Sequence, residues 1–344
     1  NSESDWSIAS PRLRARASRS PTGPASCKAS SPTGAAGAAP WAAAQSLPDQ
    51  PLRWIVPYPA GGGTDVLART VAEAMRETLG QQVVIDNRPG ASTNIGAQIV
   101  ATAKPDGGTF MSADNAVLAF NEHLFSKLPF NPEKDFTYIG GISRFPLALV
   151  VHPGFEAQTL KDFIAYAKAN PGKLNYASPG NGSPHHLAME MFKLRTGTFI
   201  THIPYRGAAP AMQDVMGGQV PCMFLDLAAG LPVIQSGKVR ALAIGSAQRA
   251  TQLPHVPTLA EGGVKNSEVF AFQGLLAPAG LPPAITARLN GDLNKALDST
   301  AVKKRMADFS MEAMPGTPEQ FKAFARAESK RWGEIIRTAN IRLD

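Results

Sequence analysis

The chain has 344 residues, of which 44% are hydrophobic and 18% are charged, and its formal net charge is +7. This is ordinary globular composition, which excludes a chain that is disordered, collagen-like or coiled-coil throughout. A single core usually stops growing near this length, so two domains are expected. Cys27 and Cys222 are too few for a disulfide framework, and no apolar run reaches the roughly 18 residues of a membrane span.

Residues 1–50 differ from the rest of the chain. They are rich in Ala, Ser, Pro, Gly and Arg and have almost no large aliphatic side chains, which predicts a disordered or leader-like segment. Three alanines at 42–44 are typical of a cleavage site, but the apolar region of a secretion signal is not recognisable. We interpret the segment as a degraded or mis-started leader, with a flexible tail as the alternative. The remaining basic residues are scattered, so nucleic acid is not an expected partner.

From residue 52 the sequence alternates between stretches typical of strands and of helices. The first predicted elements are a strand at 52–58, a helix at 67–79, a strand at 83–86, a helix around 95–99 and a strand at 109–113. Apolar residues recur every four positions from Leu67 to Leu79, which predicts one buried stripe of a helix, with Thr64 or Asp65 as its cap. Strands that alternate with helices predict a parallel α/β sheet.

A second series follows an extended apolar segment at 147–153. Its predicted strands lie at 174–178, 199–204, 220–225 and 240–244, and its predicted helices at 187–194 and 210–216. After a second extended segment at 270–277, helices are predicted at 285–297 and 321–336, the latter with a capping box of Thr317 and Gln320. Two crossings between α/β units predict a hinge that lets two lobes close over a ligand. We predict an α/β protein with lobe 1 at 51–150 and 272–344 and lobe 2 at 151–271.

One glycine-rich loop joins a strand to a helix in each lobe. Glycine lets the backbone approach a ligand closely, and the unpaired N–H groups of a helix start favour an anion. In open α/β sheets the ligand crevice lies at the carboxyl ends of the strands, where both loops are predicted. The candidate ligand-binding residues are Ala60, Gly61, Gly62, Gly63, Thr64 and Asp65 in lobe 1, and Ser178, Gly180, Asn181, Gly182 and Ser183 in lobe 2. The alternative is that each loop is only a tight turn.

Further candidate ligand-binding residues follow other predicted strands. Asp114 and Asn115 follow the strand at 109–113, and Asp226 follows the strand at 220–225. They are candidates to orient a ligand or its waters, and a helix cap is an equally good interpretation. Tyr205 and Arg206 lie in another strand-end loop. Arg206 is a candidate partner for a carboxylate, although an arginine on the surface is the commoner outcome.

The sequence carries no motif of a nucleotide site, a hydrolase or a metal centre. The first glycine loop lacks the lysine of a Walker motif, and the three spaced glycines of a dinucleotide site are missing. No serine lies in a nucleophile elbow. His185 and His186 are adjacent, so on a helix they point in different directions, and a hydrogen bond at the helix start is expected instead of a metal. We expect no catalytic residue, metal or cofactor, and interpret Cys222 as inert core.

Five motifs occur in the order of one known family. They are VPYPAGGGTD at 56–65, VIDNRPGA at 84–91, AKPDG at 103–107, the stretch 175–186 and YRG at 205–207. On these motifs residues 52–344 resemble the receptors of tripartite tricarboxylate transporters, also called the Bug family of solute-binding proteins. Ala60 stands where the family often has glycine.

The resemblance implies a two-lobed periplasmic-binding-protein fold of type II, also called a Venus flytrap. It implies a periplasmic receptor that holds a small carboxylate between its lobes, mainly through backbone groups and waters of the two loops, and delivers it to membrane permease subunits. We expect a monomer. Two other hypotheses are a receptor that signals through a partner and an enzyme on the same fold. The missing secretion signal departs from the family and concerns export, not the fold.

Overall fold

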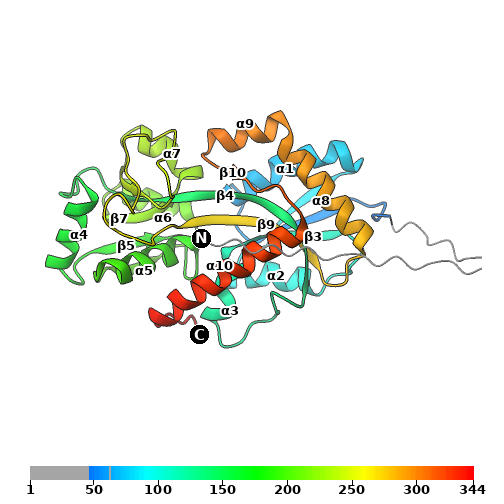
Figure 1. Cartoon of the computed structure of the whole chain (residues 1–344), viewed down its shortest axis with the longest axis horizontal. Helices are drawn as coiled ribbons and strands as arrows, with labels where there is room; N and C mark the ends of the chain where they lie inside the picture. The colour runs from blue at the N-terminus through cyan, green and yellow to red at the C-terminus, as the bar shows by residue number, and fades with distance from the viewer. Residues whose placement is uncertain (1–45, 62) are drawn as a thin grey trace, which may run out of the picture. The chain divides into compact units, whose positions relative to one another are not determined.

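In the computed structural model, which describes residues 46–61 and 63–344, strands and helices alternate along the chain (Figure 1). The strands are β1 (Leu52–Val56), β2 (Val83–Asn87), β3 (Thr109–Asp114), β4 (Phe136–Val151), β5 (Asn175–Ser178), β6 (Thr201–Pro204), β7 (Cys222–Asp226), β8 (Arg240–Ile244), β9 (Phe270–Pro278) and β10 (Glu312–Ala313). The helices are α1 (Gly63–Leu79), α2 (Asn94–Ala101), α3 (Asn121–Leu124), α4 (Leu160–Ala169), α5 (Pro184–Thr196), α6 (Ala208–Met216), α7 (Leu227–Gln235), α8 (Pro283–Asp298), α9 (Thr300–Asp308) and α10 (Pro318–Thr338). Of the predicted leader-like segment, residues 1–45 lie outside the described residues.

The strands form one mixed sheet in the order β2-β1-β3-β9-β4-β7-β5-β6, with β8 and β10 also paired to β4. In lobe 1, β1 pairs in parallel with β2 and β3, and in lobe 2, β5 pairs in parallel with β6 and β7. The long strands β4 and β9 pair antiparallel with each other and with their lobe neighbours β7 and β3. The predicted α/β fold with two lobes is confirmed.

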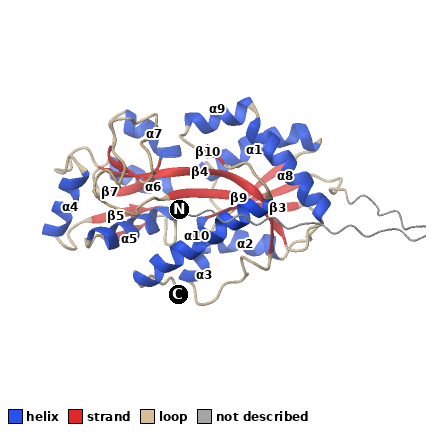
Figure 2. Ribbon diagram, viewed as in Figure 1, coloured by secondary structure: helices blue, strands red, loops and turns tan. Residues whose placement is uncertain are grey.

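Two strands, β4 and β9, cross between the lobes (Figure 2). The first part of β4 pairs with β9, and residues Leu147–Val151 pair with β7 in lobe 2. The two predicted crossing segments are therefore strands. However, β4 begins at Phe136, well before the predicted start at residue 147. The exact lobe boundaries given above stay a prediction.

Glycines explain why the first part of β4 does not look like a strand in the sequence. A Cβ on Gly274 of β9 would lie 2.0 Å from Cζ of Phe321, and a Cβ on Gly141 of β4 would lie 2.8 Å from Cβ of Met314. Phe321 belongs to α10, which packs on these strands. Glycine weakens a strand in isolation and marks a close approach, so the strand depends on tertiary packing.

The predicted helix features are largely present. Leu67, Val71, Met75 and Leu79 are buried on one side of α1, as expected. The helix begins at Gly63, so Thr64 and Asp65 lie inside its first turn, and the predicted cap is wrong. The capping box of Thr317 and Gln320 at the start of α10 is confirmed.

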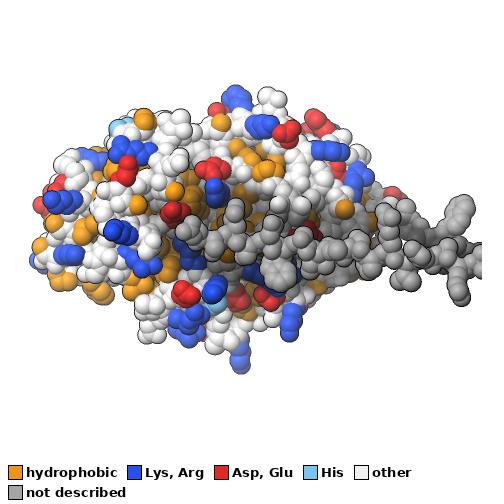
Figure 3. Space-filling view, in the orientation of Figure 1, with side chains coloured by type: hydrophobic (Ala, Val, Ile, Leu, Met, Phe, Trp, Pro, Cys, Tyr) orange, Lys and Arg blue, Asp and Glu red, His pale blue; other side chains and the backbone are white. Residues whose placement is uncertain are grey.

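The surface of the described residues carries charges of both signs. On the face drawn in Figure 3, Lys and Arg side chains lie among Asp and Glu side chains. None of the described helices combines the length and the apolar character that a membrane crossing requires.

Candidate functional site

A cavity of about 640 Å³ lies between the two lobes. Lobe 1 lines it with residues 57–59, 89–93 and Ala116, and lobe 2 lines it with residues 179–183 and 204–207. Small-molecule sites commonly enclose about 300–1,000 Å³, so this is the volume of a ligand site. The lining segments follow β1, β2, β5 and β6, so the cavity lies at the carboxyl ends of parallel strands, where ligand crevices of α/β proteins are found.

The glycine loop of lobe 1 is held from inside by Asp65. The Gly61 N–H donates to Oδ2 of Asp65 at 2.9 Å, Nε of Arg69 donates to the same oxygen at 3.0 Å, and Nδ2 of Asn87 donates to Oδ1 at 2.9 Å. Burial by itself would raise the pKa of the Asp65 carboxyl, but these hydrogen bonds outweigh it and lower the pKa. The loop therefore carries a negative charge of its own at the helix start, where the backbone dipole favours it.

The residues predicted in this loop do not line the cavity of about 640 Å³ between the lobes. Gly61 and Gly63 line a separate cavity of about 80 Å³ together with Ala228 of lobe 2. Ala60, Thr64 and Asp65 line neither of the two cavities, and Gly62 lies outside the described residues. A role of these residues in ligand binding stays a prediction, and Asp65 has a structural role that the sequence did not reveal.

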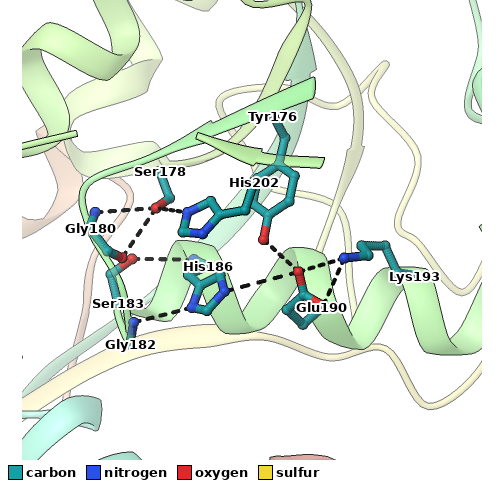
Figure 4. Close-up of polar contacts among 9 residues, drawn as sticks. All are labelled: Tyr176, Ser178, Gly180, Gly182, Ser183, His186, Glu190, Lys193 and His202. Atoms are coloured by element: carbon teal, nitrogen blue, oxygen red, sulfur yellow. Dashed lines mark hydrogen bonds and ion pairs between the residues drawn. The ribbon is translucent and has the colours of Figure 1, made fainter. Parts of the chain in front are cut away.

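The glycine loop of lobe 2 lines the cavity between the lobes. It is held by a histidine (Figure 4). The Gly182 N–H donates to Nδ1 of His186 at 3.1 Å, and the His186 N–H donates to Oγ of Ser183, the cap of α5. Ser178 lies behind the loop, fully buried, and its Oγ lies 2.6 Å from Nε2 of His202. Thus Gly180, Asn181, Gly182 and Ser183 face the cavity and Ser178 supports them.

The two histidines behind this loop are neutral. Their rings stack with centroids 4.1 Å apart, and the ring of Tyr176 stacks on His202 at 4.7 Å. Burial is the main cause that lowers the pKa of His186 to about 4 and that of His202 to about 3. Because Nδ1 of His186 accepts a hydrogen bond, its proton is on Nε2, which lies 4.0 Å from a carboxylate oxygen of Glu190. The loop of lobe 2 therefore rests on an uncharged acceptor.

His185 points the other way, as the sequence predicts for adjacent histidines on a helix. Its Nε2 lies 3.2 Å from Oδ2 of Asp226, and both side chains are buried. Asp226 also caps α7, because its Oδ1 accepts the Ala229 N–H at 2.7 Å. Among the described residues no group of three His, Cys, Asp or Glu side chains is arranged to hold a metal ion.

Asp114 and Asn115 lie behind the cavity wall. Oδ1 of Asp114 accepts the Ala116 N–H, and Oδ2 accepts the hydroxyl of Tyr58, which itself lines the cavity. Burial raises the pKa of Asp114. The side chain of Asn115 binds the backbone of β9, with Nδ2 donating to the carbonyl of Phe270. Asp226 caps a helix, and Asp114 and Asn115 bind backbone groups of the protein. None of the three lines the cavity between the lobes, and their ligand contacts stay a prediction.

Tyr205 and Arg206 both line the cavity, as predicted for a strand-end loop. The Tyr205 hydroxyl donates to Asp214 at 2.6 Å, and burial together with this bond raises the pKa of Tyr205 to about 12. Arg206 is exposed on the cavity side. It is the one charged side chain among the described residues that line this cavity.

Sequence reasoning missed the turn at 91–93, which forms the lobe 1 rim of the cavity. Ala91, Ser92 and Thr93 have φ values of 46°, 50° and 73°, a left-handed conformation that residues other than glycine rarely adopt. The Ser92 hydroxyl donates to the carbonyl of Asn181 at 3.0 Å, a hydrogen bond from lobe 1 to lobe 2. Pro89 and Gly90 before it are residues typical of a turn, but nothing in the sequence indicates three left-handed residues after them.

Comparison with known proteins identifies the class to which this fold and cavity belong. The family model described as "Tripartite tricarboxylate transporter family receptor" matches residues 67–341. The chain therefore belongs to this family of solute receptors, and its fold is the two-lobed periplasmic-binding-protein fold of type II.

Individual relatives agree with this assignment along most of the chain. Protein BugT of Bordetella pertussis is 38% identical over 309 residues, which cover 90% of this chain and 95% of the relative. A solved R. palustris protein with adipate has 35% identity and a TM-score of 0.82, covering 86% of this chain and 99% of that one. MatC from Rhodopseudomonas palustris with bound malate has 32% identity and a TM-score of 0.78, covering 84% of this chain and all of that one.

Proposed function

We propose that this protein is a periplasmic receptor that captures a small carboxylate between its lobes and delivers it to the membrane permease subunits of a tripartite tricarboxylate-type transporter. The observation that carries the proposal is the cavity between the lobes, which joins the glycine loop of lobe 2 and Arg206 to a rim from lobe 1. Membership of a receptor family supports it, and so do the adipate and malate named for two similar structures.

The geometry suits the binding of an anion that leaves the site unchanged. Arg206 supplies a positive charge at one wall, and a guanidinium binds a carboxylate through charge-assisted hydrogen bonds. The loop of lobe 2 keeps its shape through buried, neutral groups, so no carboxylate of the protein competes there. Closure of the lobes would then exclude water from the bound anion and strengthen its hydrogen bonds.

A thermal-shift panel of mono-, di- and tricarboxylates, with a neutral sugar and simple cations as controls, tests the binding step. A carboxylate at 100 times its dissociation constant adds about 2.7 kcal/mol to the free energy of unfolding. A panel in which no carboxylate raises the melting temperature, while a sugar or a cation does, contradicts the proposal.

The delivery step needs a second measurement. Uptake of the acid found in the panel is measured in the native host with and without the cognate permease genes. We expect uptake to require both the receptor and the permease. Binding without permease-dependent uptake would leave a carboxylate receptor that acts through another partner.

A further inference from the structure

The charge inside the cavity is confined to one lobe. Arg206 lies in the loop before α6, in lobe 2, where the polar side chains of Asn181 and Ser183 also line the wall. The lobe 1 wall, in its described residues, has no charged side chain. A ligand carboxylate therefore finds its cationic partner at lobe 2.

The hydroxyl groups on the lobe 1 side already donate to other groups of the protein. Tyr58 donates to Asp114, Ser92 donates to the carbonyl of Asn181, and Thr93 donates to the carbonyl of Ser92. Each hydroxyl has one proton to donate, so none of these three is left for a carboxylate.

The remaining donors of the lobe 1 wall are uncharged backbone N–H groups, those of residues 90–93 among them. Pro57, Pro59 and Pro89 have no N–H group, and Ala116 offers a methyl group. In the nearby loop of lobe 1, Asp65 is paired with Arg69, so this loop adds no free cation to the wall. A second carboxylate placed at this wall would lose its water without gaining a cation, which is costly.

We propose that the cavity takes a monocarboxylate with an apolar body, whose carboxylate binds at Arg206 and whose body packs against the prolines and Tyr58 of lobe 1. This inference rests on the proposed function and names its substrate class. The cavity of about 640 Å³ has room for an aliphatic or aromatic body larger than a four-carbon acid. The protein would then differ in preference from receptors of dicarboxylates such as adipate and malate.

The test compares two acids of one chain length, hexanoate and adipate, by calorimetric titration of the full chain. They differ only in the group at the far end, which is a methyl group in hexanoate and a carboxylate in adipate. We expect hexanoate to bind at least about tenfold more tightly than adipate, because burial of an unpaired charge weakens binding by more than tenfold. Equal or tighter binding of adipate overturns the inference and points to the N–H groups of the 91–93 turn as second donors.

Failure of the proposed function has a different signature. In that case no carboxylate of the wider panel binds, whatever its far end. A longer or aromatic monocarboxylate, such as phenylacetate, is included beside the matched pair. Tighter binding of phenylacetate than of hexanoate indicates that the apolar body is aromatic, and the comparison of hexanoate with adipate alone decides the inference.

The first of two substitutions tests where the carboxylate of the ligand binds. Arg206→Gln is expected to weaken monocarboxylate binding about tenfold to a hundredfold, because a charge-assisted hydrogen bond is lost. Arg195→Gln, on the exposed last turn of α5 and outside this cavity, is the matched control and leaves affinity unchanged. Unchanged affinity in Arg206→Gln overturns the placement of the carboxylate.

Pro89→Lys supplies the cation that lobe 1 lacks. Pro89 is exposed at the rim of the cavity, so a lysine there reaches solvent and the cavity without entering the core. We expect the ratio of adipate to hexanoate affinity to rise at least about tenfold. No change in this ratio contradicts the position of the apolar end.

Discussion

The glycine loops of the two lobes are held by the same geometry and by different chemistry. In each loop a glycine N–H donates to a side chain four residues ahead, in the first turn of the following helix. Gly61 donates to the carboxylate of Asp65 in lobe 1, and Gly182 donates to the imidazole of His186 in lobe 2. The first acceptor is charged and the second is neutral.

The surroundings of the two acceptors explain the difference. Asp65 is paired with Arg69, whose side chain is about half exposed at 51%, so its charge is compensated at the surface. His186 lies in a buried stack with His202 and Tyr176. In lobe 1 the Asp65 carboxylate therefore occupies the start of the helix. In lobe 2 an uncharged loop and the guanidinium of Arg206 line the cavity. The comparison teaches that two loops alike in sequence pattern need not bind the same group.

Acid pH should destabilise the fold through His186, which holds the glycine loop of lobe 2. His186 is neutral in the folded chain, with its pKa lowered from 6.5 to about 4, whereas in the unfolded chain it takes up a proton near pH 6.5. The contribution of neutral His186 to the free energy of unfolding is complete above pH 6.5 and is lost as the pH falls from 6.5 through 4. The loss amounts to about 3 kcal/mol below pH 4. Urea unfolding across this range measures it.

His186→Leu is the control for this pH dependence, since other groups face the same stack. His202 changes in the same direction as His186, because burial lowers its pKa as well. Tyr176 stays neutral in this range, because burial raises the pKa of its hydroxyl. The variant should be less stable at neutral pH and show a flatter decline between pH 6.5 and 4. An unchanged slope would mean that His186 is protonated in the folded protein, against the neutral acceptor inferred here.

Asp65→Ala breaks the lobe 1 side of the comparison. The Gly61 N–H, Arg69 and Asn87 lose a shared acceptor, so we expect a loss of about 2 kcal/mol in the free energy of unfolding at pH 7. Glu73→Ala removes an exposed ion pair with Arg76 on the same helix and should have no measurable effect. Equal stability of the two variants would show that Asp65 does not hold the loop.

Ser92→Ala has the smallest expected effect and tests the contact between the lobes. It removes the hydroxyl that donates to the Asn181 carbonyl, a bond worth about 0.5–1 kcal/mol. We expect carboxylate affinity to fall about two- to fivefold with an unchanged melting temperature of the free protein. Ser236→Ala, whose hydroxyl bonds only within lobe 2, is the matched control. Affinity equal to that of the control would mean that closure does not depend on this bond.

The sequence by itself predicted most of the fold, because periodicity and turn residues are local. The stripe from Leu67 to Leu79, the capping box at Thr317 and the two crossing segments are each readable from neighbouring residues. It missed α7, which has Gly230 and Pro232 inside the helix, two residues that favour loops in isolation. It also missed the start of β4, where glycine is needed because α10 packs closely.

For the site, the sequence identified the two glycine loops and the loop of Arg206, and the structure brings the lobe 2 loop and Arg206 to one cavity. It could not show that Asp65 turns inward to its own loop, that His186 does the same, or that Ala91–Thr93 adopt left-handed backbone conformations. The two glycine contacts span only four residues, but the acceptor side chains are also held by partners distant in sequence, Asn87 for Asp65 and His202 for His186. Local patterns therefore determined which elements form, and only the tertiary structure decided which glycine loop lines the cavity between the lobes.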